Sequence, residues 1–225
     1  MIPWELLDQA PVAGSAEVLS LWRRGNEYSI RIGRQELMNS RAHHSEEMLA
    51  ELTCAKVRDR PAPGVLIAGL GMGYTLAAAL RQLPAESRVT VAELVPAVVH
   101  WNQHHLGTLA GHPLDDQRVR VVEGDVGKVL RQEPAAYDAI LLDVDNGPEG
   151  LTSRANDALY SPAGLAAACT ALRPQGVLAV WSAHPCASFA KRLGQAGFAV
   201  EEVRLRARGR LGGGRHTVWL ATRKG

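Results

Sequence analysis

This sequence of 225 residues has few cysteines, no long apolar runs and little net charge. Its three cysteines, Cys54, Cys169 and Cys186, lie far apart and form no C-x-x-C pair, which argues against a disulfide framework and against structural zinc. No stretch approaches the roughly 18 consecutive apolar residues of a membrane-spanning helix. The first residues, MIPWELLDQAPVAG, lack the basic and apolar regions of a signal peptide. A cytoplasmic protein that does not enter a membrane is therefore expected.

The formal net charge is only +2, but basic residues gather near the C-terminus. They are Arg204, Arg206, Arg208, Arg210, Arg215, Arg223 and Lys224. Such a cluster is typical either of a patch for an anionic partner such as nucleic acid or of the solvated face of an edge hairpin. Because the arginines alternate with strand residues and no aromatic platform accompanies them, we predict the solvated face and no nucleic-acid partner.

The N-terminal residues predict a small β appendage over residues 1–42. Residues 16–22 and 27–32 are short β-prone runs, and Gly25-Asn26 between them suits a two-residue hairpin turn because both residues tolerate positive φ. A third short strand is predicted over residues 35–38. An amphipathic helix is then predicted to begin at Ser45-Glu46-Glu47.

Strands and helices alternate regularly in the rest of the chain, residues 43–225. Predicted strands cover 65–68, 88–92, 119–122, 137–142 and 177–181, and predicted helices cover 77–83, the region after Pro96, 126–131, 162–172 and 185–196. Continuous apolar strands in such an alternation indicate a parallel sheet with helices on both faces. Two final strands, 198–205 and 216–222, have no helix between them. We therefore predict an α/β, Rossmann-like class I methyltransferase fold, with a mostly parallel seven-stranded sheet and a C-terminal antiparallel hairpin.

A glycine-rich turn, Gly69-Leu70-Gly71-Met72-Gly73, follows the first strand of this region. Glycines at such a turn allow the backbone to bend tightly and a ligand to lie close against it. The pattern is G-x-G-x-G and differs from the dinucleotide fingerprint G-x-G-x-x-G. By itself it is weak support for a ligand site, since a glycine turn can serve packing alone.

Acidic residues follow the next three strands and strengthen the case for a ligand site at the glycine turn. Glu93 lies where a carboxylate can accept hydrogen bonds from ribose hydroxyls, and Asp125 lies where a side-chain oxygen can meet an adenine amino group. Asp143 ends the fourth strand and faces the crevice at the carboxyl ends of the strands. Any one of these acids could simply cap a helix, but the set favours a nucleotide-like ligand. The predicted cofactor-binding residues are Gly69, Leu70, Gly71, Gly73, Glu93, Leu94, Asp125, Val126 and Asp143.

The segments VLIAGLGMG, VTVAELV, VRVVEGDV and YDAILLDVDNGP, in this order, resemble the spermidine/spermine synthase family. The N-terminal hairpin followed by Ser45-Glu46-Glu47-Met48-Leu49, and the segment Asn156-Asp157-Ala158-Leu159-Tyr160, also look like parts of that family. The resemblance implies S-adenosylmethionine or its decarboxylated form as cofactor, with Glu93 on ribose and Asp125 on adenine. It also implies a loop over the reacting centre at 143–150 and a homodimer formed through the N-terminal strands.

Two positions depart from the pattern of the family. Met72 stands where the family usually has an aspartate that holds the amine of the decarboxylated donor. Asn146 stands where the family has the loop aspartate that deprotonates the attacking amine, and an amide cannot be a general base. Asp145, one position away, could take that role. The predicted catalytic residues are therefore Asp143, Asp145 and Tyr160.

The functional prediction from the sequence is a transferase that moves a methyl group from S-adenosylmethionine to a small acceptor. The alternatives are an aminopropyltransferase of polyamine biosynthesis, which acts on an amine, and a nucleotide-binding homologue without catalysis. A nicotinamide dehydrogenase is disfavoured because Asp125, Asp143 and the terminal hairpin have no place in it.

Histidines supply secondary candidates. His43, His44 and His184 are candidates for substrate contact. His100 and His104 have the i,i+4 spacing of metal ligands, but no Glu or Cys joins them at ligand spacing, so we predict a surface helix face and no metal site.

Overall fold

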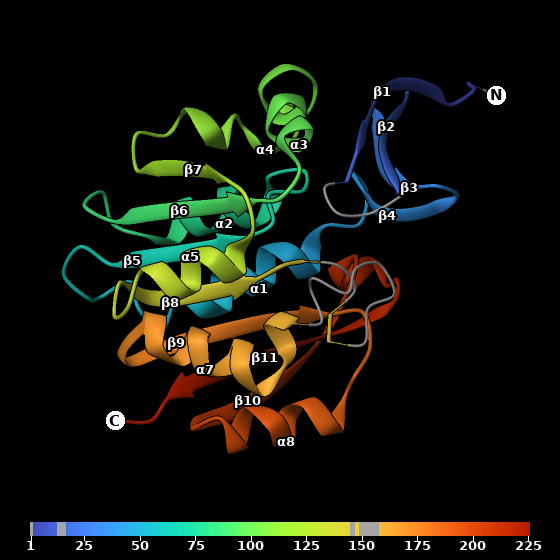
Figure 1. Cartoon of the computed structure of the whole chain (residues 1–225). Coiled ribbons are helices and arrows are strands. Elements are labelled where there is room, and N and C mark those ends of the chain that lie inside the picture. The colour runs from blue at the N-terminus through green and yellow to red at the C-terminus, as the bar shows by residue number, and fades with distance from the viewer. Residues whose placement is uncertain (1, 13–16, 145–146, 149–157) are drawn as a thin grey trace.

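The computed structural model of the chain describes residues 2–12, 17–144, 147–148 and 158–225. A four-stranded antiparallel sheet comes first, in the order β1-β2-β3-β4 (Figure 1). Its strands are β1 (Glu5–Pro11), β2 (Val18–Arg24), β3 (Glu27–Ile32) and β4 (Gln35–Asn39). The predicted hairpin is confirmed, since β2 and β3 pair antiparallel around Gly25-Asn26, with Gly25 at a φ of +60°. Strand β1 was not predicted.

The second sheet has seven strands in the order β10-β11-β9-β8-β5-β6-β7. Its strands are β5 (Gly64–Ala68), β6 (Arg88–Glu93), β7 (Val119–Glu123), β8 (Tyr137–Leu142), β9 (Leu172–Ser182), β10 (Phe198–Arg206) and β11 (Arg215–Arg223). The strands from β9 to β7 pair in parallel, whereas β11 is antiparallel to both β9 and β10. The predicted fold, with its C-terminal antiparallel hairpin, is therefore confirmed.

The central strand β5 separates two hydrophobic cores. Val65 and Ile67 face one core and Leu66 and Ala68 the other, because side chains alternate along a strand. On the first side lie α1 (His44–Cys54), α2 (Tyr74–Gln82), α3 (Pro96–Trp101) and α4 (Gly107–Ala110). On the second side lie α5 (Val126–Gln132), α7 (Pro162–Ala171) and α8 (Ala187–Gln195). Helices thus cover both faces of the sheet (Figure 1).

Local signals at the helix ends are confirmed in part. Ser161 caps α7, and its hydroxyl accepts a hydrogen bond from the Gly164 amide at 3.1 Å, with Pro162 in the first turn. The helix predicted after Pro96 differs from expectation. A π-helical turn, η1 (Asn102–Leu106), interrupts it between α3 and α4. Two 3-10 turns, η2 (Pro113–Asp115) and η3 (Gly209–Leu211), complete the described elements.

The arginine-rich C-terminal segment forms the edge of the large sheet. Strand β10 is the outermost strand, and Arg204, Arg206 and Arg215 are exposed on the β10–β11 hairpin. This placement agrees with the predicted solvated face, because charged side chains on an edge strand discourage pairing with other chains. None of the helices in the described part of the chain combines the length and the apolar character that crossing a membrane requires.

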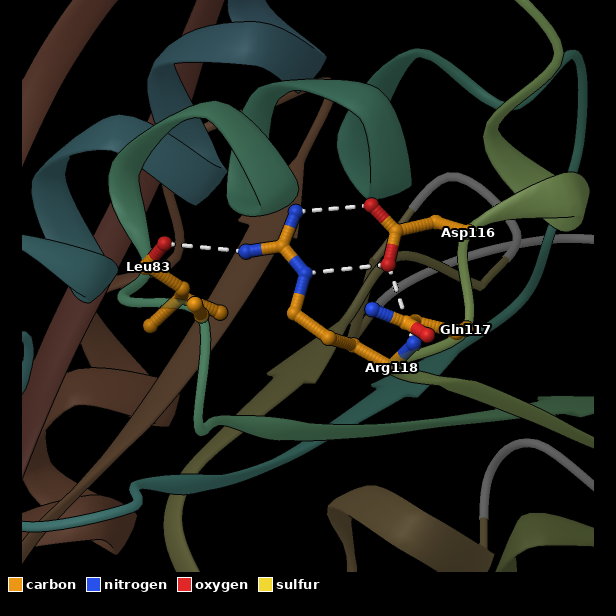
Figure 2. Close-up of a pocket in the computed structure, with 5 residues that line it drawn as sticks. Leu83, Asp116, Gln117 and Arg118 are labelled. Carbon is orange, nitrogen blue, oxygen red and sulfur yellow. Dashed lines mark hydrogen bonds and ion pairs between the residues drawn. The ribbon is translucent and has the colours of Figure 1, made fainter.

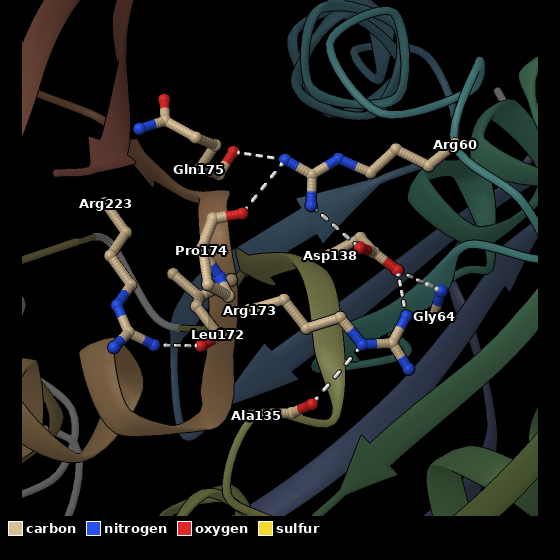
Figure 3. Close-up of polar contacts among 9 residues, drawn as sticks. All are labelled: Arg60, Gly64, Ala135, Asp138, Leu172, Arg173, Pro174, Gln175 and Arg223. Atoms are coloured by element: carbon tan, nitrogen blue, oxygen red, sulfur yellow. Dashed lines mark hydrogen bonds and ion pairs between the residues drawn. The ribbon is translucent and has the colours of Figure 1, made fainter. Parts of the chain in front are cut away.

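A buried carboxylate joins three segments at the amino ends of the parallel strands (Figure 3). Asp138, at the start of β8, is only 2% exposed. Its oxygens lie 2.8 Å from Arg60 Nη1 and 2.6 Å from Arg173 Nη1, and the Gly64 amide donates to it at 2.8 Å. Arg60 also donates to the Gln175 carbonyl at 2.6 Å. Asp138 therefore fastens the start of β5 and the start of β9 to β8.

We expect Asp138→Ala to lower the free energy of unfolding by about 2–4 kcal/mol, because it leaves a buried amide and two arginines without their carboxylate. This loss of free energy is smaller than for a fully buried ion pair, since the side chains of Arg60 and Arg173 keep 26% and 35% of their surface exposed. Urea unfolding followed by circular dichroism measures the loss. Glu5→Ala is the matched control, because it breaks the exposed pair between Glu5 and Arg23 and should cost less than about 1 kcal/mol. Equal losses in the two variants would contradict this role of Asp138.

Candidate active site

The glycine-rich turn lies at the carboxyl ends of the parallel strands, where three strand ends meet. The Gly69 amide donates to the Ala92 carbonyl at 2.9 Å, and the Asp143 amide donates to the Ala68 carbonyl at 3.0 Å. The end of β5 is thereby tied to the ends of β6 and β8. Strand order reverses here, because the chain runs from β5 outward to β7 and returns to β8 on the other side of β5. Open α/β sheets bind their ligands at such a switch point.

Close packing explains why the turn needs glycine. Gly69 has a φ of +87°, and a Cβ at this residue would lie 2.5 Å from the Asp143 carbonyl oxygen. Any larger residue would push β8 away from β5. From the other side, Met38 of β4 lies against the turn, with its Sδ 2.9 Å from where a Cβ of Gly71 would be. The N-terminal sheet thus contacts the turn.

Glu93 lies at the end of β6, where the sequence places it, and is 7% exposed. Its Oε2 accepts a hydrogen bond from the Leu70 amide at 2.8 Å, and its Oε1 accepts one from the Val95 amide at 2.9 Å. Burial raises the pKa of this carboxyl, although the backbone amides around it, including that of Leu94, act in the opposite direction. The Gly71 amide is among them, so four backbone amides act on this carboxyl. The ribose role predicted for Glu93 stays a prediction.

Asp125 begins α5 as its N-cap. Its Oδ1 accepts a hydrogen bond from the Gly127 amide at 2.8 Å, and the neighbouring Val126 is buried with 6% of its surface exposed. This is the capping role that a single acid at a strand end was expected to allow. Its second oxygen takes no part in this cap. The adenine contact predicted for Asp125 stays a prediction.

Asp143 follows β8 and bonds to a residue that the sequence did not reveal. The Thr75 hydroxyl donates to Asp143 Oδ2 at 2.5 Å. Burial raises the pKa of Asp143 to about 6, and the bond from Thr75 partly offsets this shift. A carboxyl with such a pKa exchanges its proton near neutral pH, which suits a general base.

Glu46, in the first turn of α1, is a second carboxyl close to Asp143. Burial raises its pKa well above the usual value, and the negative charges of Asp143 and Glu47 act in the same direction. The Thr75 hydroxyl lies 3.4 Å from the Glu46 carbonyl oxygen, so one side chain contacts both acidic residues. Glu47, by contrast, faces His43 at 3.3 Å and Arg81 at 3.4 Å.

No ion pair joins Glu46 or Asp143 to a basic side chain within the described ranges. Acids in a first helical turn usually complement the helix dipole, and this common pattern concealed Glu46 from sequence reasoning.

The other predicted catalytic residues are Tyr160 and Asp145. Tyr160 is 2% exposed, and its hydroxyl donates to the Val144 carbonyl at 3.1 Å, beside Asp143. A catalytic role for Tyr160 stays a prediction, and the contact itself supports the end of β8. Asp145 and Asn146 lie outside the described residues. Met72 is fully buried in the core and presents no side chain to the site.

Aromatic and imidazole groups surround the start of α1. The His43 ring stacks on Tyr74 with centroids 4.0 Å apart. Ser45 Oγ lies 2.8 Å from His216 Nδ1, and His216 in turn packs edge-on against Trp181. Sequence reasoning missed His216 and Trp181, because their strands bring them to this place from the far end of the chain.

The other predicted histidines make different contacts. His44 contributes its backbone amide to the Ala207 carbonyl at 3.2 Å, and the His184 carbonyl accepts a hydrogen bond from Ser182 Oγ at 2.8 Å. The rings of His100 and His104 are 4.2 Å apart on an exposed helix face. Within the described residues, no three His, Cys, Asp or Glu side chains gather as metal ligands.

A hollow of about 550 Å³ lies at the opposite edge of the sheet, between the end of α2 and the start of β7 (Figure 2). Its lining residues are Leu83, Ala85, Asp116, Gln117 and Arg118. The Arg118 guanidinium bonds twice to Asp116, at 2.9 Å and 2.7 Å, and donates to the Leu80, Leu83 and Pro84 carbonyls. Its donors are therefore divided between Asp116 and the carbonyls at the end of α2. The hollow is separate from the site at the carboxyl ends of the strands.

Known proteins are similar to this chain in sequence or in fold. Two Streptomyces coelicolor proteins are similar in sequence: polyamine aminopropyltransferase 2, 37% identical over 123 residues, and polyamine aminopropyltransferase 1, 31% identical over 153 residues. The matched regions are 53% and 64% of this chain but only 21% and 28% of those proteins. The chain thus matches about a quarter of their length.

Solved structures agree on the fold. A spermidine synthase in complex with the transition state analogue AdoDATO has a TM-score of 0.77 and 17% identity, over 96% of this chain and 73% of that one. The spermidine synthase of Thermotoga maritima has a TM-score of 0.73 and 16% identity, over 96% and 72% of the two chains. Residues 43–191 match the family profile of the spermine/spermidine synthase domain. This match covers well over half of the sequence, and the chain therefore belongs to the spermine/spermidine synthase family.

Proposed function

We propose that this protein transfers the aminopropyl group of decarboxylated S-adenosylmethionine to a small amine. The sequence relatives named above are polyamine aminopropyltransferases, which supports the second of the functions considered from the sequence. Methyl transfer, the function favoured by the sequence, has no support from these relatives. Because the matched region is a small part of their length, their activity extends to this chain as a proposal.

The observation that carries the proposal is the pair of carboxyls formed by Glu46 and Asp143. Both residues are half-buried. Burial and the neighbouring charge of Asp143 raise the pKa of Glu46, so an ionised Glu46 is costly unless a cation lies near it. The donor's aminopropyl chain ends in an ammonium group, which would supply the missing positive charge. Intact S-adenosylmethionine carries an additional carboxylate on that chain, and the pair would repel it. The site therefore favours the decarboxylated donor.

Glu46 also offers an explanation for Met72. The family's aspartate is missing from the glycine turn, and the buried Met72 does not replace it. In our proposal the negative charge comes from α1 instead, so the preference for an amine without a carboxylate is kept by a residue elsewhere in the sequence.

The reaction is an in-line displacement at the methylene carbon bound to the sulfonium. The acceptor nitrogen forms a bond to this carbon while the carbon–sulfur bond breaks, and the electron pair of that bond leaves with sulfur as neutral methylthioadenosine. Asp143 accepts the proton that the acceptor ammonium must lose. The glycine turn, Glu93 and Asp125 hold the adenosyl part, and their main contribution is orientation.

Donor discrimination tests this function. We expect the wild-type protein to bind decarboxylated S-adenosylmethionine at least about tenfold more tightly than the intact form, since one unfavourable charge contact is worth on the order of 1.4 kcal/mol. Glu46→Gln should reduce this ratio of affinities, mainly because the decarboxylated donor binds more weakly to the variant. Isothermal titration calorimetry with each donor measures both affinities.

Glu47→Gln is the matched control for that experiment. It removes the neighbouring acid of the same helical turn, which pairs with Arg81 at 3.4 Å, so the donor ratio should change less than in Glu46→Gln. Equal affinity of the wild-type protein for the two donors, or tighter binding of the intact one, would contradict the proposal.

A further inference from the structure

Asn102 lies in the π-helical turn η1, beside the glycine-rich turn. The residue is 3% exposed, and it follows Trp101 at the end of α3. Its Nδ2 donates to the Gly71 carbonyl at 2.8 Å and to the Val98 carbonyl at 2.9 Å. Both neighbours are acceptors, so only the amide nitrogen can face them and the orientation of the side chain is determined. A residue of the helix after β6 thus holds the middle of the glycine turn.

The other atom of the same amide has no obvious structural use. Asn102 Oδ1 is buried and has no hydrogen-bond partner within the described residues. A buried polar atom without a partner is uncommon in folded proteins, so such a residue is retained for a contact made by its other atoms. That contact is the bond to Gly71. The helix is also irregular here, and π-helical turns inside helices are often found at functional sites.

Gly73 shows how closely Asn102 approaches the turn. Its φ is +83°, and a Cβ there would lie 3.0 Å from Asn102 Oδ1 and 3.1 Å from Pro113 Cγ. The glycine therefore lets the helix and the turn come together.

Glu93 and Asn102 bind neighbouring backbone groups of the glycine turn. Glu93 accepts a hydrogen bond from the Leu70 amide, and Asn102 donates one to the Gly71 carbonyl. Together they fix the orientation of the backbone at Leu70 and Gly71. We propose that Asn102 is a positioning residue that keeps the glycine turn in the conformation that binds the adenosyl donor. This inference rests on the proposed function for the identity of the ligand, but the positioning itself concerns the protein alone.

The first test measures the turn in the protein without ligand. Hydrogen–deuterium exchange resolved at the Leu70 amide should be at least about tenfold faster in Asn102→Ala than in the wild type, because one hydrogen bond of the turn is lost. Leu106→Ala is the control, since Leu106 is a fully buried residue of the same turn η1 whose loss destabilises the protein without touching Gly71. Asn102→Asp provides a second variant of nearly unchanged shape should the alanine variant not fold.

The second test measures ligand binding with methylthioadenosine as the probe. Asn102→Ala and Asn102→Asp should weaken its Kd about tenfold, and KM for the donor should rise while KM for the acceptor stays within about twofold. Exchange at Leu70 that equals the control, or unchanged affinity for the probe, would overturn the inference. If the wild-type protein binds no methylthioadenosine, the proposed function fails, and the exchange result alone decides the role of Asn102.

Discussion

Replacing Glu93 with alanine is expected to weaken binding of the adenosyl donor at least about a hundredfold, to the point where calorimetry detects none. The carboxylate has two functions in this account. It accepts hydrogen bonds from the Leu70 and Val95 amides and so holds the glycine turn and the start of α3. In the proposed function it also accepts hydrogen bonds from the ribose hydroxyls of the donor. Its loss leaves buried amides without a partner and removes the acceptor for the ligand, so the two effects act in the same direction.

Glu123→Ala is the matched control for Glu93→Ala. Glu123 lies directly opposite Glu93 in the register of β6 and β7, but it is exposed. The same substitution at the same level of the sheet should leave donor affinity within about twofold of the wild type, as expected for an exposed position with no ion pair to another described residue. Unchanged affinity in Glu93→Ala would rule out this placement of the donor.

Asp143→Asn is expected to lower kcat by a factor of about 10²–10⁴, which is the usual contribution of a general base. The amide keeps the size of the side chain and can still meet Thr75, but it cannot take a proton from the acceptor. Single-turnover measurements with decarboxylated S-adenosylmethionine and a diamine separate this loss from any change in binding. A kcat within about threefold of the wild type would exclude Asp143 as the base and transfer the role to Asp145.

The pH dependence of the reaction gives a second measure of Asp143. Because burial raises the pKa of Asp143 to about 6, the basic form accumulates as the pH rises through 6, and kcat/KM should increase over that range and then level off. Thr75→Val should move this rising limb of the pH profile to higher pH, since the Thr75 hydroxyl stabilises the ionised Asp143 carboxylate. A limb near pH 4, or one that does not respond to Thr75→Val, would contradict the assignment.

The fold could be predicted from the sequence because its signals are local and repeated. Buried parallel strands such as Val65-Leu66-Ile67-Ala68 are continuously apolar, and punctuating residues such as Gly25-Asn26 and Ser161-Pro162 mark the turns and helix starts. Strand β1 escaped prediction because it is an exposed edge strand, with Leu6 44% exposed, and so lacks the alternation of a half-buried strand.

The site could be predicted only where its residues follow strand ends. Glu93, Asp125 and Asp143 have such positions, and the structure brings Glu93 and Asp143 to the same glycine turn. Glu46 and Asn102 come from helices, where an acid in the first turn or a polar residue within an amphipathic pattern looks like ordinary surface. Their contacts depend on how the helices pack, which no local pattern reveals.

The preference between the two donors also depends on contacts that the sequence does not reveal. Met72 suggested that the site had lost its preference for the decarboxylated donor, because sequence reasoning expected the negative charge to come from the glycine turn itself. In the folded chain the Glu46 carboxyl comes from a different element, and the negative charge of Asp143 raises its pKa. The charge of a site depends on every residue that the fold brings to it. A charge that is absent from one segment can therefore be supplied by a residue of another segment.

Product analysis by mass spectrometry tests the central claim most directly. The purified protein is incubated with a diamine and either decarboxylated or intact S-adenosylmethionine, and the nucleoside products are identified. We expect methylthioadenosine together with the aminopropylated amine, formed only from the decarboxylated donor and only when the diamine is present. Formation of S-adenosylhomocysteine from the intact donor, or no product from either donor, would contradict it.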